Sequence, residues 1–123
     1  MLRRELIGLW LPVLAWATLI FAFSAQPATS LPNTGNLVQK GAHVGEYAVL
    51  AALLWRALAG RRLGRTAVLG FAWLAAVLYA VSDETHQLFV PGRHGSPLDL
   101  VIDGLGAAFG LFLASLFRGV RSP

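Results

Sequence analysis

Four apolar runs, separated by short polar stretches, set the pattern of this chain of 123 residues. They cover residues 6–23, 42–59, 66–82 and 98–117. An α-helix rises about 1.5 Å per residue, so about 20 apolar residues cross the ~30 Å hydrocarbon core of a bilayer. Each run approaches that length, and the third is short unless Asp83 and Glu84 lie in its last turn. The pattern predicts an all-α fold, a polytopic membrane four-helix bundle that forms a single domain over residues 1–123.

The composition agrees with a membrane protein. Hydrophobic residues make up 56% of the chain and charged residues 13%, which is too apolar for an ordinary soluble domain. Cysteine is absent, which excludes a disulfide framework and thiolate metal sites. The net charge of +4 would suit nucleic acid, but the arginines flank apolar runs and the aromatic residues lie inside them. We therefore expect the lipid bilayer as a partner and no nucleic acid.

Arginines gather on one side of the predicted bundle. Seven of them lie at the termini or in the link between the second and third runs: Arg3, Arg4, Arg61, Arg62, Arg65, Arg118 and Arg121. The connections 24–41 and 82–97 carry only Lys40 and Arg93 as basic residues, leaving histidine aside. Cytoplasmic loops of membrane proteins carry an excess of Lys and Arg. This asymmetry predicts both termini in the cytoplasm and both of these connections outside.

A cleaved signal peptide is the alternative for the N-terminal run. Arg3 and Arg4, the apolar core and the small residues Ala22, Ser24 and Ala25 follow the order of such a peptide. The core is longer than in a typical signal peptide, which favours a retained span. Cleavage would leave three spans, and the remaining charge pattern permits both forms.

The second run begins with a polar helical face. Lys40, His43 and Tyr47 recur at spacings of three and four, so a helix places them on one side, with Glu46 at its edge. Glu46 falls inside the apolar segment, where a charged side chain is costly unless it faces a partner or water. A functional role for Glu46 is therefore favoured over simple solvation.

The third and fourth runs carry matching polar groups at the same predicted membrane face. Asp83 and Gln87 are four residues apart, and so are Asp99 and Asp103. Asp83, Glu84 and Asp99 could each be a solvated group near a helix end, and a proline after Ser96 fits the first position of a helix. Asp103 lies deeper, so this explanation is weaker for it. If the bundle closes, these groups converge on one polar site.

Asp103 shares a helical stripe with Gly106 and Gly110. Small residues four apart let membrane helices approach closely, so the glycines favour tight packing of the fourth helix and say little about function.

Several chemistries suit these groups. Lys40 and Arg93 would bind a phosphate or carboxylate, Arg93 through its planar fork. Glu46 or His43 could act as a catalytic general base. Metal ligation is conceivable through the set His43, His86, Glu46 and Asp83. No zinc-ligand spacing such as His-Glu-x-x-His occurs, so we predict neither a metal site nor another cofactor.

Taken together, the polar motifs resemble those of the VanZ-like membrane proteins, in order and in spacing, from about residue 23 to about residue 110. The motifs are Phe23-Ser24-Ala25-Gln26, Lys40-Gly41-Ala42-His43-Val44-Gly45-Glu46-Tyr47, Ser82-Asp83-Glu84-Thr85-His86-Gln87-Leu88-Phe89-Val90-Pro91-Gly92-Arg93, and then Ser96, Asp99 and Gly106. The family is named for a bacterial protein linked to resistance to the glycopeptide teicoplanin. The resemblance implies a multi-pass protein of the bacterial inner membrane that acts in the cell envelope, and it implies no particular reaction.

The resemblance also selects residues. Those carried over as ligand-binding candidates are Gln26, Lys40, His43, Glu46, Tyr47, Asp83, Glu84, Gln87, Arg93 and Asp99. Asp103 joins them from its own position, where the family commonly has Asn, so this chain has an additional ionisable group there. His86 and His94 fit the motifs less well, and we expect both in a solvent-exposed loop.

Three functions are compatible with these features. The leading one is an outward-facing site that binds an anionic envelope component, a lipid-linked precursor or a phospholipid headgroup. The second is a hydrolase or transferase at the outer leaflet, with Glu46 or His43 as base and Arg93 stabilising developing charge. The third is a structural role in which the polar groups hold the helices together.

Overall fold

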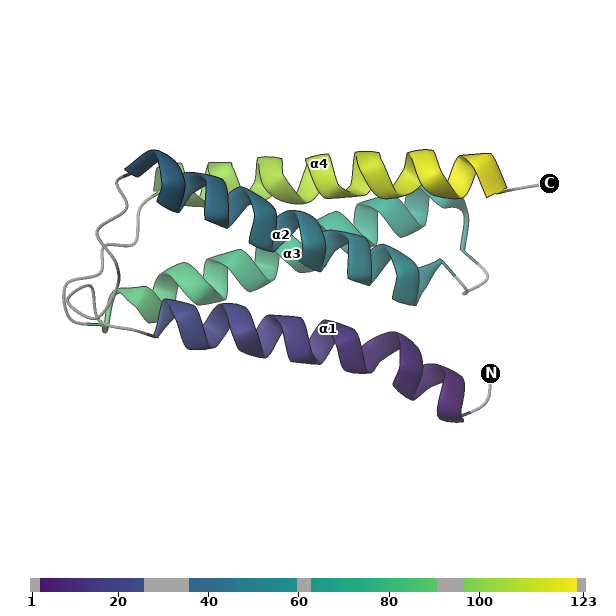
Figure 1. Cartoon of the computed structure of the whole chain (residues 1–123), viewed down its shortest axis with the longest axis horizontal. Coiled ribbons are helices and arrows are strands. Elements are labelled where there is room, and N and C mark those ends of the chain that lie inside the picture. The colour runs from purple at the N-terminus through teal and green to yellow at the C-terminus, as the bar shows by residue number, and fades with distance from the viewer. Residues whose placement is uncertain (1–2, 26–35, 60–62, 91–96, 122–123) are drawn as a thin grey trace.

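Four α-helices form the described part of the computed structural model, and this part contains no strand. It describes residues 3–25, 36–59, 63–90 and 97–121, of which 36–40 and 117–121 are described by their backbone alone. The helices are α1 (Arg3–Ser24), α2 (Asn36–Leu58), α3 (Arg65–Gln87) and α4 (Pro97–Arg121). Successive helices run in opposite directions, so the start of α1 and the end of α4 lie at the same end of the bundle (Figure 1). The all-α, four-helix prediction is confirmed.

The helix ends lie within four residues of the ends of the predicted runs, except at the start of α2, which begins six residues earlier, and at the end of α3. That helix continues to Gln87, so the acidic stretch lies in its last turns and not in the predicted connection 82–97. The reason is burial: Asp83, Glu84 and Gln87 are between 2% and 5% exposed, because they face the neighbouring helices. At the other side of this connection α4 begins at Pro97, as expected of a proline at the first helical position.

Three of the described helices are long and apolar enough to cross a membrane: α1, α3 and the segment Pro97–Leu116 of α4. Helix α2 coincides with the predicted span 42–59 but is not among them. Its sequence carries His43, Glu46 and Arg56, which lower its hydropathy.

Large apolar side chains cover the outward faces of these three helices. On α4 they recur every three or four residues, as Leu98, Val101, Leu105, Phe109, Phe112 and Leu116, each at least half exposed. Helices α1 and α3 carry similar rows, with Leu14 62% and Leu78 60% exposed. Soluble monomers rarely expose apolar surface on this scale. Such rows are expected of helices that face lipid, and the chain is therefore a membrane protein.

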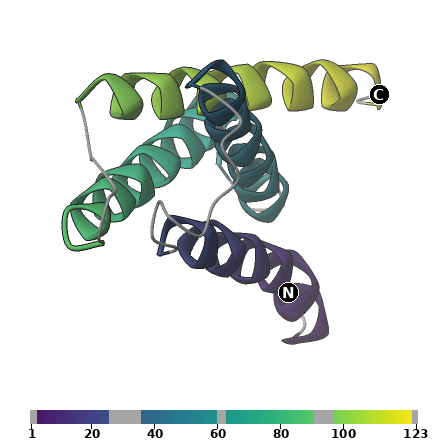
Figure 2. The same ribbon diagram turned by 60° about the vertical axis from the view of Figure 1, so that its left-hand side comes forward.

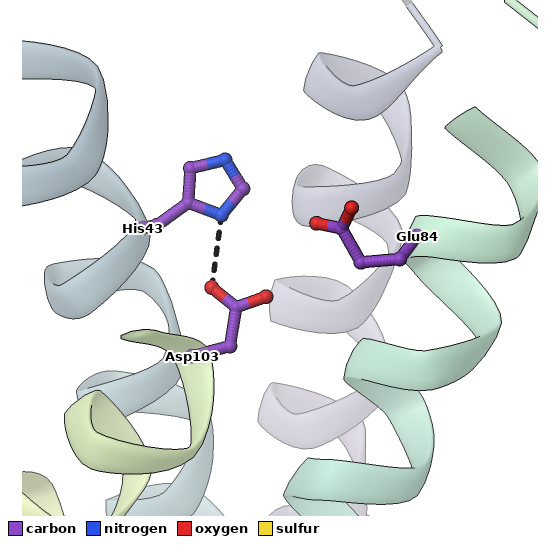
Figure 3. Close-up of side chains that lie close together, drawn as sticks. All are labelled: His43, Glu84 and Asp103. Atoms are coloured by element: carbon purple, nitrogen blue, oxygen red, sulfur yellow. Dashed lines mark hydrogen bonds and ion pairs between the residues drawn. The ribbon is translucent and has the colours of Figure 1, made fainter. Parts of the chain in front are cut away.

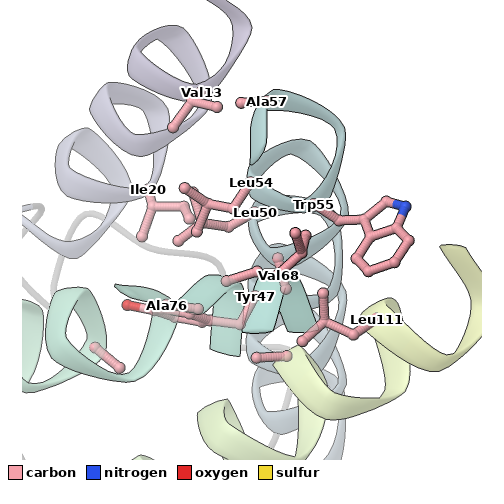
Figure 4. Close-up of a cluster of buried hydrophobic side chains, with 14 residues drawn as sticks. Val13, Ile20, Tyr47, Leu50, Leu54, Trp55, Ala57, Val68, Ala76 and Leu111 are labelled. Atoms are coloured by element: carbon pink, nitrogen blue, oxygen red, sulfur yellow. The ribbon is translucent and has the colours of Figure 1, made fainter. Parts of the chain in front are cut away.

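Helix α2 is the central element. It contacts each of the other three helices and packs most extensively on α4, whereas α1 and α4 make no contact within the described ranges. Figure 2 shows α1 and α4 on opposite sides of the α2–α3 pair. The core follows this arrangement, since Leu50 and Leu54 of α2 are buried beside Ile20 of α1 (Figure 4).

The α2–α4 contact depends on two glycines. A Cβ atom built on Gly106 would lie 2.8 Å from the carbonyl oxygen of Val44, and one on Gly110 would overlap the carbonyl group of Ala48. No residue larger than glycine fits either position without moving the backbones apart. The predicted packing role of this glycine pair is confirmed.

Side chains that donate to backbone carbonyls join the helices in several further places. These hydrogen bonds run from Trp16 Nε1 to Glu46 O (2.8 Å), Arg56 NH1 to Gly8 O (3.1 Å), Trp73 Nε1 to Gly104 O (3.0 Å), Arg65 NH2 to Ser115 O (3.3 Å) and Tyr79 OH to Ala17 O. The aromatic residues Trp16, Trp73 and Tyr79 thus contribute to the contacts between helices.

Candidate functional site

The centre of the polar cluster is a pair between α2 and α4. His43 Nδ1 and Asp103 Oδ1 are 2.9 Å apart. The close approach at Gly106 explains the pairing, because Asp103 lies one turn before Gly106 on α4 and His43 lies next to Val44 on α2. The side chain of Asp103 is fully buried, while that of His43 is 20% exposed. The pair therefore links a sealed carboxylate to an imidazole that solvent can reach.

Glu84 of α3 completes a group drawn from three helices. Its carboxylate points toward the pair across the space between the helices (Figure 3). One ligand atom from each of His43, Glu84 and Asp103 lies within 4.8 Å of the others. Because Glu84 is only 5% exposed, two carboxylates are buried close together at this point.

A second contact joins α2 to α3 one turn further along. The hydroxyl of Tyr47 donates a long hydrogen bond of 3.4 Å to Asp83 Oδ2. Tyr47 is fully buried and Asp83 is 2% exposed. Since Tyr47 follows His43 by one helical turn and Asp83 precedes Glu84, this contact is continuous with the group of three.

Gln87 takes part in a third contact, to α1. Its Nε2 donates to Ser24 Oγ at 2.7 Å, and both side chains are buried. Ser24 was not predicted as a site residue. The signal for it is its place in the Phe23–Gln26 motif, as a small polar residue at the end of an apolar run.

Glu46 and Asp99 lie at the edge of the cluster. Both are half-buried, and both interact with neighbouring groups. Glu46 also accepts, through its backbone carbonyl, the hydrogen bond from Trp16. The structure thus brings five predicted residues into the connected centre, His43, Tyr47, Asp83, Glu84 and Asp103, with Glu46 and Asp99 on its rim.

The structure does not describe the side chains of several predicted site residues, including both cationic ones. Gln26, Arg93 and His94 fall outside the described residues, and Lys40 is described only by its backbone, three residues before His43 on α2. The predicted role of Lys40 and Arg93 in binding a phosphate or carboxylate therefore stays a prediction.

The expectation that His86 lies in an exposed loop is wrong. His86 belongs to the last turn of α3, and its ring lies against Phe21 of α1, with 4.4 Å between ring centroids. Its Nδ1 is buried and has no hydrogen-bond partner among the described residues. The error follows from the extension of α3, which turns this residue toward α1.

The cluster has two chemical capacities. The carboxylate of Asp103 orients the imidazole of His43, an arrangement suited to proton transfer. The group of His43, Glu84 and Asp103 also offers one nitrogen and two oxygen ligands, which suit a divalent cation. This ligand set shares only His43 with the set conceived from the sequence, because spacing along the chain does not show which helix faces are opposed.

Comparison with known proteins agrees with the motifs. Neither a curated protein nor a solved structure gives a significant match to the chain. The sequence profile of the VanZ/LLP1 family matches residues 9–118, nearly the whole chain and all four helices. With its polar motifs gathered by α2, α3 and α4 at one end of a membrane bundle, the chain belongs to the VanZ/LLP1 family.

Proposed function

We propose that the polar cluster is the base of a site that binds the anionic group of a cell-envelope component at the outer face of the bacterial inner membrane. The component is a lipid-linked precursor or a phospholipid headgroup. The observation that carries the proposal is the convergence of His43, Glu84 and Asp103 from three helices inside a bundle whose outer surface is apolar. Buried ionisable groups in a membrane protein are costly, so their retention favours a function.

The anion itself needs cations. The described centre contains the carboxylates Asp83, Glu84 and Asp103 and one imidazole, so on its own it would repel a phosphate. Lys40 and Arg93 supply the missing positive charge in this proposal, Arg93 through bidentate hydrogen bonds. The carboxylates would then orient these cations and His43.

Three further features support the location. The arginine distribution favours this end of the bundle as the outer one. Lys40 lies on α2 three residues before His43, and Arg93 follows the end of α3 by six residues in the sequence. A protein that binds an envelope precursor would also change the amount of precursor that a glycopeptide can reach. Such an effect would account for the glycopeptide resistance linked to the protein for which the family is named.

Lipid binding to the full-length chain in detergent tests the proposal. Phosphatidylglycerol and a polyprenyl diphosphate are titrated against phosphatidylethanolamine and followed by native mass spectrometry. Because a charge-assisted hydrogen bond contributes about 1.5–3 kcal/mol, Lys40→Gln and Arg93→Gln should each weaken anionic-lipid binding about tenfold or more. Arg56→Gln removes the same charge at the other end of α2 and should leave binding unchanged. Equal affinity for anionic and zwitterionic lipids would refute anion recognition.

The His43–Asp103 hydrogen bond favours a second candidate, a hydrolase or transferase. With Nδ1 held by Asp103 at 2.9 Å, His43 presents its other ring nitrogen as a general base, and Arg93 would stabilise developing charge. Glu46 is the alternative base. If the protein is a hydrolase or transferase, it should turn over a lipid substrate, and His43→Gln should abolish turnover without changing the affinity for the lipid. If the protein only binds the lipid, no turnover is expected.

A structural role is favoured by the contacts themselves. Each polar pair joins two different helices, as in His43–Asp103, Tyr47–Asp83 and Gln87–Ser24. If this is their only role, their substitution should lower stability and assembly, and function should fall only in proportion.

A further inference from the structure

The three side chains at the centre of the cluster have the composition of a metal site. They provide one imidazole nitrogen and two carboxylates, each from a different helix, with the ligand atoms within 4.8 Å of one another. We propose that His43, Glu84 and Asp103 bind one divalent transition-metal ion such as Mn²⁺ or Zn²⁺. The proposal does not depend on anion binding, because it rests only on these three side chains.

The spacing is close to that of ligands on a single ion. Nitrogen and oxygen ligands bind Zn²⁺ at about 2.0–2.2 Å, so two of them on one ion are at most about 4.4 Å apart. His43 Nδ1 and Asp103 Oδ1 are 2.9 Å apart, and the ligand atoms of the three side chains all lie within 4.8 Å of one another. The spacing therefore exceeds the limit for one ion by no more than about 0.4 Å.

One oxygen of Asp103 points independently to a ligand. Asp103 is 1% exposed, and its Oδ2 is buried with no hydrogen-bond partner among the described residues. Figure 3 shows this oxygen on the side of the carboxylate that faces Glu84, away from the hydrogen bond to His43. An unsatisfied buried carboxylate oxygen costs free energy, and coordination to a cation would satisfy it.

Charge leads to the same conclusion. Two carboxylates buried close together in a membrane bundle repel each other, and a divalent cation between them replaces this repulsion by attraction. A divalent ion neutralises both and needs only the neutral imidazole as its nitrogen ligand. The nitrogen that binds the ion must be unprotonated, so coordination through Nδ1 would replace its hydrogen bond to Asp103.

The ligand types select the ion. Imidazole together with carboxylate suits Zn²⁺, Mn²⁺ and Fe²⁺, whereas Mg²⁺ and Ca²⁺ prefer all-oxygen sites. Three protein ligands leave at least one coordination position for water or for an oxygen of a bound molecule. The 20% exposure of the His43 side chain provides access to the site from solvent.

The test measures metal binding to the full-length chain in detergent after treatment with a chelator. MnCl₂, ZnCl₂ and MgCl₂ are titrated separately, and bound metal is counted by elemental analysis. We expect one equivalent of Mn²⁺ or Zn²⁺ and weaker Mg²⁺ binding. Asp103→Asn and Glu84→Gln should weaken Mn²⁺ binding about 10–100-fold or more, since each removes a ligand charge. Glu5→Gln makes the same change as Glu84→Gln in the first turn of α1, at the other end of the bundle and outside the polar cluster, and should retain binding.

A spectroscopic measurement covers the case in which these variants do not assemble. Pulsed electron paramagnetic resonance on the unsubstituted protein with one equivalent of Mn²⁺ should show the nitrogen coupling of a single imidazole, which His43→Gln removes. The proposal is overturned if no metal binds stoichiometrically, if bound Mn²⁺ shows no nitrogen coupling, or if Glu5→Gln and Glu84→Gln weaken binding equally.

Discussion

At the scale of single residues, the most telling feature is the depth at which the polar side chains lie. Asp103 is 1% exposed within the segment of α4 that is long and apolar enough to cross a membrane. A carboxylate in such a place is tolerated only with a partner. His43 provides that partner from another helix, so each of the two side chains compensates the cost of burying the other.

This mutual dependence predicts an energetic coupling. His43→Leu and Asp103→Leu should each lower the free energy of unfolding, but together they should cost less than their sum, by about 0.5–2 kcal/mol. The reason is that removal of one partner leaves the other buried and unsatisfied. Unfolding in mixed detergent micelles measures the cycle. A control cycle of His43→Leu with Ser115→Ala, near the other end of α4, should be additive. Additivity in the first cycle as well would mean that the 2.9 Å contact contributes nothing to stability.

Glu46 is the residue on which function is expected to depend most clearly. Glu46→Gln keeps the size and hydrogen-bonding capacity of the side chain and removes its charge. The variant should insert at the normal level and lose function in a complementation assay of the envelope phenotype, and Glu46→Leu should be no better. Glu5→Gln removes an exposed charge in the first turn of α1 and should retain function. If Glu46→Gln retains it too, the site rests on Asp83, Glu84 and Arg93.

At the scale of elements, the contact between α2 and α4 determines the geometry of the site. The glycines bring the two backbones together, and this approach places Asp103 against His43. A wider separation would break the pair before it disturbed either helix. The small residues of α4 therefore contribute to the polar site without carrying any polar group.

The importance of the close α2–α4 contact can be tested by replacing two different glycines of α4 with alanine. Gly110→Ala adds a Cβ atom that would overlap the carbonyl group of Ala48, so it should destabilise the fold by about 1–3 kcal/mol. Gly104→Ala adds a Cβ atom whose nearest neighbour is Val77 Cγ2 at 3.8 Å, an ordinary contact, so stability should stay the same or rise slightly. Thermal unfolding in detergent separates the two. Equal melting temperatures would show that the close approach is not required.

The helices themselves could be predicted because an apolar run of membrane length has few alternatives. The burial of the acidic stretch could not be predicted, since Asp83, Glu84 and Gln87 look like solvated groups until their partners on α1 and α2 are known. That polar side chains of α2, α3 and α4 lie close together could be predicted, because they occupy matching helix ends. Their pairing could not, because the pairs Tyr47–Asp83 and His43–Asp103 depend on helix rotation, which the sequence pattern does not report. The role of these residues in binding stays a prediction.

At the scale of the whole molecule, four antiparallel helices place both ends of the described chain on one side. The polar cluster lies toward the opposite end, at the start of α2 and the end of α3. The direction of the bundle across the membrane thus decides whether the site serves the envelope or the cytoplasm. The arginine distribution favours the envelope side.

Cysteine labelling in intact cells tests this orientation. A cysteine at position 33 or 95, introduced as Asn33→Cys or Gly95→Cys, should react with an impermeant thiol reagent. Leu63→Cys, in the connection between α2 and α3, should react only after the membrane is opened. The chain has no cysteine of its own, so the reagent labels this protein only at the introduced position. Labelling of Leu63→Cys in intact cells would reverse the orientation and move the site to the cytoplasmic face.

The central place of α2 has a consequence for the synthesis of the protein. Its main packing partner, α4, is the last of the four described helices to be made, and Asp103 follows His43 by 60 residues. At a translation rate of about 5–20 residues per second, His43 exists for about 3–12 s before its partner emerges from the ribosome. Of the described helices, α1 and then α3 are the ones that can cover the polar face of α2 during that interval. The nascent chain is therefore most exposed to the translocon and to quality-control proteases at this stage, until α4 arrives.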